Sequence, residues 1–591
     1  MAEKTIKTDV LVVGGGGAGF RASIAARERG AKVLLLSKGP LARCGASPMA
    51  GADFTLDGNS MNKLGREGDT NDSMERVFND IVSQGWYLNN QRLVEQYVKT
   101  APVLLKDMMD WGMEIKMSDQ RMIFTSGTHI MDVLLKKARS VGVDMLADVA
   151  LLELVTRDGK VTGGLGLDIR TGGFIHFTAK AVVMATGGWH KGFWPNTGMR
   201  DLSGEGIAMS NRAGADIGNM EFITFCCNVF YEPPMWLGSI APYMVSLICG
   251  GRLTNSRGED ILEGYDPYVV KTGTMTEWNK SFISYASMRE IRDGRRFKNG
   301  GVHYSRGDAS WDYMKMVASF VFPDWRYKSI DLSPWAKMLE NDEPVEVGPA
   351  VEYFEGGIVV NERFETGITG LFAAGECALG AFGANRVFSA ITEMLVHGKD
   401  AGENAGEYAI DSKAGEADGG LLASLMEKAE QPLLKKKGES PPCLRRHIQE
   451  MAHKHLGPIR NEAELKEFIG FLEDVKNSQL KDLATAGKSR TYNKEWLDAL
   501  ELPNIVHLLE AAARSALARK ESRGVHFRED YPDTDNDSWL VESIVKLKDD
   551  TIEVGNRPAT VTKMTPPKGK IPYLDMMKKM MKEHSDTGGK H

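Results

Sequence analysis

The most constraining feature of the sequence is a glycine-rich turn that follows an apolar run near the N-terminus. Val10–Val13 are four large apolar residues, as expected for a strand buried on both faces of a parallel sheet. Gly14, Gly16 and Gly19 follow with the G-x-G-x-x-G spacing, and a helix is predicted directly after them. The order strand, glycines, helix favours a dinucleotide-binding unit over a glycine-rich hairpin.

A second apolar strand, predicted over 32–37, completes the unit and indicates which dinucleotide it binds. In NAD-binding units an acidic residue often ends this strand and holds a ribose. Ser37 and Lys38 occupy that position here, which favours FAD. We expect the pyrophosphate to lie on the free amides of the helix N-terminus, around Gly17 and Ala18.

Length and composition limit the class of protein. A chain of 591 residues exceeds what one hydrophobic core supports, so several domains are expected. A net charge of −7, without a basic face, gives no reason to expect nucleic-acid binding. Six scattered cysteines provide neither a metal or cluster motif nor a disulfide framework. With no signal peptide or long apolar run, we expect a cytoplasmic protein that reaches the inner face of a membrane only through partners.

The pattern of apolar segments predicts an α/β chain whose first domain is interrupted. The strand predicted at 181–185 returns the chain to the first sheet after a long insertion. The tail has a short amphipathic stretch at 574–581, which we interpret as a frayed or partner-docked end rather than a membrane anchor. The predicted units are a Rossmann-like FAD-binding domain (1–225 and 351–410), an inserted α+β capping domain (226–350), a linker (411–421), a helical C-terminal domain (422–563) and a tail (564–591).

A series of short motifs gives the sequence a family resemblance. It resembles the flavoprotein subunits of succinate dehydrogenase and fumarate reductase along nearly its whole length. The resemblance implies FAD, a mobile capping domain and a separate iron–sulfur subunit that exchanges electrons with the flavin. The motifs, in chain order, are Val12–Gly19, Ala185–Gly188, Ser203–Met209, Asn211–Ala215, Glu221-Phe222, Ala373–Cys377, Gly383–Arg386, Glu393–Val396 and Ala518–Gly524.

The last motif lies in the C-terminal domain found in complex-forming members of the family. Its charged residues, Arg519–Arg523, are therefore a predicted partner contact, with a solvated helix face as the alternative.

The resemblance also assigns residues to the FAD site. Glu376 is expected to accept hydrogen bonds from ribose hydroxyls, and Glu205 to face the flavin. The amides of Val387–Ala390 stand at a helix start, where they would stabilise negative charge on a reduced flavin. The complete predicted FAD site is Gly14, Gly16, Gly17, Ala18, Gly19, Ser37, Lys38, Cys44, Gly45, Gly51, Thr186, Gly187, Glu205, Glu376, Arg386, Ser389 and Ala390.

The sequence departs from the family where the flavin is attached covalently. Respiratory members usually use a histidine shortly after the second strand, but this chain has none before His129. The corresponding stretch is Arg43–Ser47, so we expect noncovalent FAD. A thioether link through Cys44 is the alternative.

The substrate site departs further. The family binds a dicarboxylate with two histidines and two arginines. Alignment places Cys226 and Glu352 at the histidines and Tyr285 at the proton-donating arginine, with Arg289 nearby, while Arg386 is retained. A carboxylate repels a dianion, so plain succinate or fumarate is not the expected substrate.

These observations predict an FAD-dependent oxidoreductase that exchanges electrons with an iron–sulfur partner and acts on another small molecule. One alternative is an electron-transfer flavin module of a larger redox complex, without an organic substrate of its own. Another is a degenerate subunit that holds FAD only as a folding ligand. No metal site is predicted in this chain.

Overall fold

A parallel sheet forms the centre of the computed structural model, which describes residues 4–50, 53–275, 278–321, 331–386, 388–413, 415 and 419–586. The apolar run 10–13 is its middle strand and is almost completely buried. All neighbouring strands are parallel, as in a doubly wound α/β fold. Across the sheet the strands are β18 (Leu371–Ala373), β11 (Ala181–Met184), β2 (Val10–Val13), β3 (Val33–Leu36) and β7 (Asp144–Leu146).

Two helices of this region pack unusually closely because small residues meet at their contact. Helix α1 (Gly17–Glu28) begins directly after the glycine turn, and α12 (Ala390–Asp411) lies against it. A Cβ on Gly398, Gly402 or Gly406 would lie 2.6, 2.3 or 3.1 Å from the backbone of α1. The four-residue spacing places these glycines on one face of α12. The helices predicted at 20–30 and 391–409 are therefore confirmed.

The insertion between β3 and β11 contains helices and an antiparallel meander. Its helices are α2 (Gly58–Lys63), α3 (Met74–Gln84), α4 (Gln91–Asp110) and α5 (Gly127–Ser140). A small sheet orders β4 (Asp53–Thr55), β6 (Met122–Phe124) and β5 (Met117–Asp119). The meander is β10 (Phe174–Thr178), β9 (Lys160–Asp168) and β8 (Val149–Arg157), and the N-terminal strand β1 (Lys4–Lys7) adds to it in parallel beside β10.

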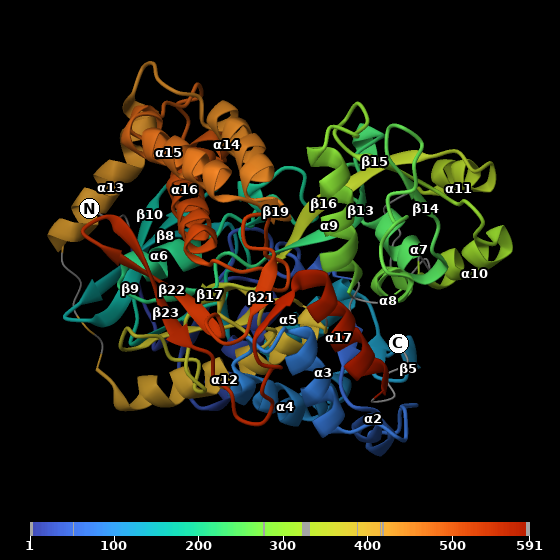
Figure 1. Ribbon diagram of the computed structural model, residues 1–591. Coiled ribbons are helices and arrows are strands. Elements are labelled where there is room, and N and C mark those ends of the chain that lie inside the picture. Colours follow the sequence, from blue (N-terminus) through green and yellow to red (C-terminus); the bar gives the residue numbers. More distant parts are fainter. Residues whose placement is uncertain are drawn as a thin grey trace.

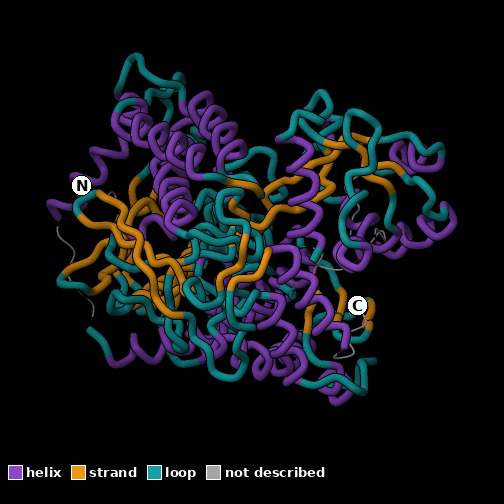
Figure 2. Tube along the Cα trace, viewed as in Figure 1, coloured by secondary structure: helices purple, strands orange, loops and turns teal. Residues whose placement is uncertain are grey.

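The capping region forms a separate lobe, green to yellow on the right of Figure 1. Its sheet orders β13 (Ile223–Phe230), β16 (Val345–Phe354), β15 (Val302–Ser305) and β14 (Arg252–Thr254). Figure 2 shows these strands surrounded by helices. The helices are α7 (Ala241–Cys249), α8 (Pro267–Met275), α9 (Asn279–Arg292), α10 (Trp311–Val321) and α11 (Ser333–Glu340). Both β13 and β16 run past the predicted limits of 226 and 350, so paired strands connect the lobe to the rest of the chain.

The C-terminal region begins with helices and ends with strands. The helices are α13 (Gly419–Leu434), α14 (Pro441–His455), α15 (Glu462–Asn477) and α16 (Lys494–Ala518). The hairpin of β22 (Val541–Lys548) and β23 (Thr551–Pro558) extends a sheet through β12 (Ile217–Gly218) to β17 (Gly357–Ile358). Short paired strands complete it: β19 (Ile459–Arg460) with β20 (Phe527–Arg528), and β21 (Asp533–Asp535) with β24 (Lys570–Pro572). The helical character predicted for 422–563 thus ends at Ala518.

The charged motif at 519–523 corrects a prediction of partner contact. Arg519, Glu521 and Arg523 are each at most 1% exposed. Arg519 pairs with Glu221 at 2.7 Å, and Glu521 pairs with both arginines. These charges therefore join the C-terminal region to the FAD-binding region, and only Lys520 of the motif is exposed.

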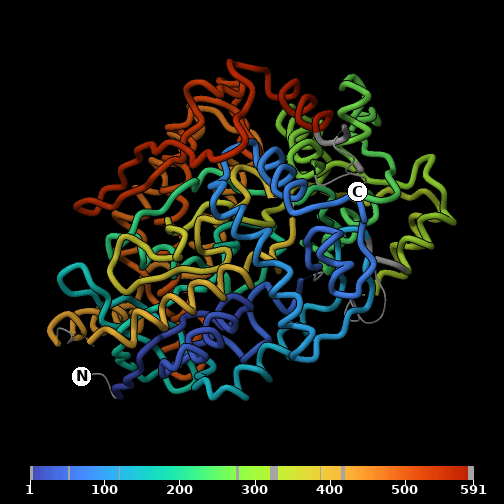
Figure 3. The backbone as a smooth tube through the Cα atoms, turned by 90° about the horizontal axis from the view of Figure 1, so that it is seen from below, coloured from blue at the N-terminus to red at the C-terminus, as the bar shows by residue number. Residues whose placement is uncertain are grey.

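The tail also binds within its own chain. Helix α17 (Tyr573–Asp586) contains the predicted amphipathic stretch, and Met576, Met577, Met580 and Met581 are buried. It packs on α8 and α3 (Figure 3). The Tyr573 ring stacks on Trp86 with centroids 5.0 Å apart. The apolar face is therefore neither frayed nor left for a partner. None of the helices in the described part of the chain is long and apolar enough to cross a membrane.

Candidate active site

A cavity of about 1210 Å³ lies between the parallel sheet and the capping lobe. Its volume exceeds the roughly 300–1,000 Å³ of an ordinary small-ligand pocket. Strand ends explain its position, because Gly14, Lys38, Thr186 and Glu376 follow β2, β3, β11 and β18 and all line it. In parallel sheets, ligands bind at the carboxyl ends of strands.

In the glycine turn, Gly16 faces open space in the cavity, whereas Gly14 and Gly19 pack directly against backbone atoms. A Cβ on Gly14, whose φ is +124°, would lie 2.1 Å from the Ala185 carbonyl oxygen. One on Gly19 would lie 1.8 Å from the Gly14 carbonyl oxygen, so both glycines allow close packing. At Gly16 a Cβ would meet only Ser47 Oγ, at 3.4 Å, and Gly16 lines the cavity. Gly17 and Ala18 line it too, at the start of α1, where backbone amides favour anions.

The residues that end the second strand have separate roles. Ser37 is buried, and its hydroxyl donates to the Gly39 carbonyl at 2.8 Å rather than facing the cavity. Lys38 lines the cavity and pairs with Glu205 at 2.7 Å and with Glu501 of α16 at 2.9 Å. Burial opposes the charge of Lys38, but the two carboxylates raise its pKa above the ordinary value. Glu205 lines the cavity at the start of α6 (Glu205–Arg212).

Cys44 and Gly45 lie on the loop beside these groups and line the cavity. The Cys44 thiol lies 3.1 Å from Ser37 Oγ, and burial raises its pKa. A thiol with a raised pKa is a weaker nucleophile at neutral pH, because the thiolate is the reactive form. Gly45 donates its amide to Asp201 at 2.8 Å. Gly51 lies outside the described residues.

Glu376 is the buried acid of the site. It lines the cavity, and burial raises its pKa to about 7 although Arg386 opposes this shift. Glu376 Oε1 and Thr186 Oγ1 are buried without a hydrogen-bond partner among the residues that the structure describes. An unpaired buried acceptor is costly unless a ligand satisfies it.

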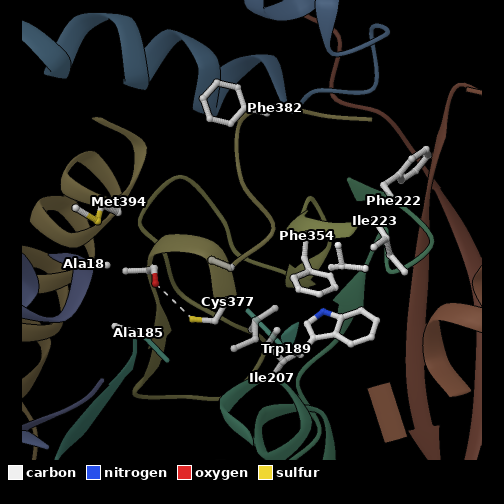
Figure 4. Packing of buried hydrophobic residues seen from close by; sticks show 14 of the residues in the cluster. Ala18, Ala185, Trp189, Ile207, Phe222, Ile223, Phe354, Cys377, Phe382 and Met394 are labelled. Atoms are coloured by element: carbon white, nitrogen blue, oxygen red, sulfur yellow. Dashed lines mark hydrogen bonds between the residues drawn. The ribbon is translucent and has the colours of Figure 1, made fainter. Parts of the chain in front are cut away.

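Packing beneath the cavity holds Glu376 in place. Figure 4 shows Trp189, Phe354 and Cys377 in this buried layer. The Trp189 and Phe354 rings stack with centroids 4.2 Å apart. The Cys377 thiol, next in sequence to Glu376, donates to the Met184 carbonyl at 3.2 Å. The turn that carries the carboxylate is therefore fixed to β11.

The start of α12 closes this end of the cavity. Ser389 accepts the Thr392 amide at 3.2 Å as the N-cap, and Ser389 and Ala390 line the cavity. Val387 lies outside the described residues. The Gly16 space, the helix amides and the unpaired Glu376 oxygen together fit the pyrophosphate and ribose of FAD.

Arg386 also lines the cavity and is 5% exposed, with its guanidinium carbon 3.6 Å from the centre of the Tyr353 ring and 4.3 Å from that of Phe382. Its Nη2 pairs with Glu393 at 2.7 Å, and its Nε lies 3.7 Å from Glu355. Burial raises the pKa of Glu355 to about 7 despite the arginine. Arg386 Nε and Nη1 have no hydrogen-bond partner within the described chain.

The structure corrects three of the five predicted catalytic positions. Glu352 and Arg386 line the cavity, but Cys226, Tyr285 and Arg289 do not. The Cys226 side chain is fully buried in β13. The Tyr285 ring packs on Phe527 with centroids 4.7 Å apart, and Arg289 reaches the Tyr285 hydroxyl at 3.3 Å.

Lys280 is a cavity-lining cation that the sequence reasoning missed. It lines the cavity from α9 and pairs with Glu352 at 3.3 Å. Lys280 and Tyr285 are five residues apart, which separates them by roughly 140° around a helix. Only the Lys280 face of α9 meets the cavity. The signal available in the sequence was a lysine five residues before Tyr285, in the same short segment.

His190 and the α7 wall were missed as well. His190 lines the cavity, and burial lowers its pKa to about 4. Its Nε2 lies 2.7 Å from the Glu352 carbonyl oxygen. Ile240, Met244, Leu247 and Ile248 line the cavity from the capping lobe. Their i, i+4, i+7, i+8 spacing could have indicated one helix face.

Two family models match the chain. The first, described as an FAD binding domain, matches residues 9–390, which is more than half of the chain. The second, described as the C-terminal part of the fumarate reductase flavoprotein, matches residues 445–571. The first match contains all the cavity-lining residues except Ile391 and Met394, and the second covers most of the C-terminal region.

Similar proteins agree with these matches. A fumarate reductase (CoM/CoB) chain from Methanothermobacter marburgensis is 28% identical, over 90% of this chain and 96% of its own. The fumarate reductase flavoprotein subunit of Haemophilus influenzae is 27% identical, over 96% of each chain. Among solved structures, Mycobacterium smegmatis Sdh1 is 27% identical with a TM-score of 0.82, over 95% of this chain and 96% of its own.

A second solved structure is the FrdA chain of E. coli quinol fumarate reductase. It is 25% identical with a TM-score of 0.81, over 96% of this chain and 99% of its own. The predicted fold class is therefore confirmed, and the cofactor is FAD. The chain belongs to the family of succinate dehydrogenase and fumarate reductase flavoprotein subunits, and it is an FAD-dependent oxidoreductase.

Proposed function

We propose that this flavoprotein exchanges electrons with a monoanionic or neutral organic molecule, and that succinate and fumarate are poor substrates. The observation that supports this most is the charge balance at the substrate end of the cavity. Arg386 and Lys280 border it, and each already faces a carboxylate, Glu393 at 2.7 Å and Glu352 at 3.3 Å.

A bound dicarboxylate would add two negative charges beside Arg386 and Lys280, which are already paired with carboxylates. Two like charges 4 Å apart repel by about 4 kcal/mol at the effective dielectric constant near a protein surface. Glu352 presents such a charge on the cavity wall. Arg121 also borders the cavity, but Asp72 and Asp80 already neutralise it. The site therefore suits one anionic group better than two.

The proposed roles follow from position. Arg386 binds one carboxylate or similar oxyanion through its guanidinium, where Nε and Nη1 lack a hydrogen-bond partner among the described residues. FAD supplies the two-electron chemistry when it is bound. Lys280, rather than Tyr285 or Arg289, gives a proton to the reacting carbon or takes one from it. Glu352 holds the Lys280 ammonium group at the wall.

We further propose that an iron–sulfur protein is the electron partner. The six cysteines are all free, and no group of metal-binding side chains occurs in the described part of the chain. The flavin would then exchange single electrons with an iron–sulfur cluster in another subunit. That subunit would also provide any membrane contact.

The test uses the purified flavoprotein with its FAD, assayed for fumarate–viologen and succinate–dye turnover. We expect little activity in both assays. Robust fumarate reduction that is lost in Arg386→Ala and Lys280→Met, but retained in the control Lys271→Met, would refute the proposal. Lys271 is an exposed lysine of the same lobe. Flavin reduction by a copurified partner, with no turnover of any small molecule tested, would favour the pure electron-transfer module instead.

A further inference from the structure

An apolar helix face borders the same cavity beyond the charged groups. Ile240 and then Met244, Leu247 and Ile248 of α7 recur at helical spacing and line the cavity. All four side chains are only partly buried. Leu332, directly before α11, also lines the cavity and is partly buried. The protein therefore keeps an apolar wall open toward its FAD site.

The other face of α7 fixes the direction of this wall. Val245 is buried, and Ser246 accepts the Asn228 side-chain amide of β13 at 2.9 Å. Helix α7 packs against β13, so its orientation in the lobe is set by buried contacts. The open face is consequently a built surface of the cavity.

The wall begins where the charged groups end. The Lys280 ammonium lies 5.8 Å from the centre of the Tyr243 ring, on α7. From Ile240 to Ile248 no residue carries a charge at neutral pH. A ligand whose anionic group binds near Arg386 and Lys280 would continue along this apolar surface.

We infer that the substrate is a monoanion with an extended apolar group, and that the α7 face selects it by burying that group. The inference rests on the proposed function and adds the substrate class. It predicts that affinity grows with the length of the apolar group. Burying one methylene is worth about 0.8 kcal/mol, which corresponds to about fourfold in Kd.

The probes are trans-2-alkenoates of increasing chain length, with fumarate as the dianionic comparison. Each is titrated into the oxidised holoprotein, and binding is followed by the change in flavin absorbance. We expect Kd to fall about three- to fourfold per methylene until the group outgrows the wall. A Kd that does not depend on chain length would overturn the inference.

Two variants locate the effect. Met244→Gln should flatten the dependence on chain length, whereas Met316→Gln should keep it. Met316 is an exposed methionine on α10 of the same lobe and does not line the cavity. The measured quantity is the slope within each variant, so a general loss of affinity does not mimic the effect. Equal slopes in the two variants would overturn the role of α7.

The two proposals fail in different ways. Robust fumarate turnover refutes the proposed function. Absent fumarate turnover together with a flat alkenoate series refutes only the apolar substrate class.

Discussion

FAD binding should depend on pH through Glu376. In the FAD-free protein, burial raises the pKa of this carboxyl to about 7, although Arg386 opposes the shift. Ribose hydroxyls donate more strongly to a carboxylate than to a neutral acid. Binding therefore favours the ionised form, so affinity is highest well above pH 7 and falls as the pH drops through 7. Because half of the carboxyl groups are already protonated at pH 7, Kd should rise about fivefold from pH 7 to pH 6, and it approaches about tenfold (about 1.4 kcal/mol) per unit at lower pH.

Glu376→Gln removes the charge and with it the pH dependence. At pH 8 the variant loses a charge-assisted hydrogen bond worth about 1.5–3 kcal/mol, which raises Kd roughly 10- to 150-fold. The difference in Kd between this variant and the natural protein should shrink as the pH falls, because the carboxyl of the natural protein then becomes protonated. The assay is titration of the deflavinated protein with FAD, followed by fluorescence quenching, between pH 5.5 and 8.5.

Glu355→Gln is the matched control. Glu355 is also buried beside Arg386, and burial raises its pKa to about 7, but it does not line the cavity. This variant should keep the natural pH profile of FAD binding. If the natural protein binds FAD equally well from pH 6 to pH 8, or if Glu376→Gln keeps the natural profile, the role assigned to Glu376 is wrong.

Three further outcomes are expected. FAD should remain in the supernatant after acid precipitation, since a noncovalent cofactor is predicted; a fluorescent pellet would instead indicate a link to Cys44. Gly16→Val should abolish flavin binding by filling the pyrophosphate space, whereas Gly470→Val on α15, where a Cβ meets nothing within 4 Å, should retain flavin. Lys38→Met leaves Glu205 and Glu501 without their shared cation and should cost about 3–5 kcal/mol of stability, seen as a lowered melting temperature. An unchanged melting temperature would show that Lys191 alone compensates Glu501.

Local pattern was sufficient for the FAD-binding unit. The run 10–13 and the glycine spacing predicted β2, the turn and α1, and the structure has all three. A buried parallel strand needs continuous apolar residues, and Gly14 needs a positive φ, so both constraints are visible in a few consecutive residues. The family resemblance assigned residues after four strands to one FAD site, and the structure brings them together because parallel strands end at one edge of the sheet.

Local pattern was insufficient wherever a helix face had to be chosen. Tyr285 and Lys280 belong to one helix, and only packing against the lobe sheet decides which of them meets the cavity. The same holds for α17. Its sequence shows an apolar face, but that pattern does not say whether the face packs on this chain, on a partner or on a membrane. The structure places that face on α3 and α8.

The sequence by itself determined the cofactor and the central sheet, because each depends on residue identity over a short segment. The tertiary structure decided which charges meet. It buried Arg519, Glu521 and Arg523, which alternate in the sequence like a solvated face. It also paired Lys280 with Glu352, 72 residues away, on the cavity wall. Such pairings depend on the packing of distant segments, and the charge balance of the cavity is therefore a property of the fold.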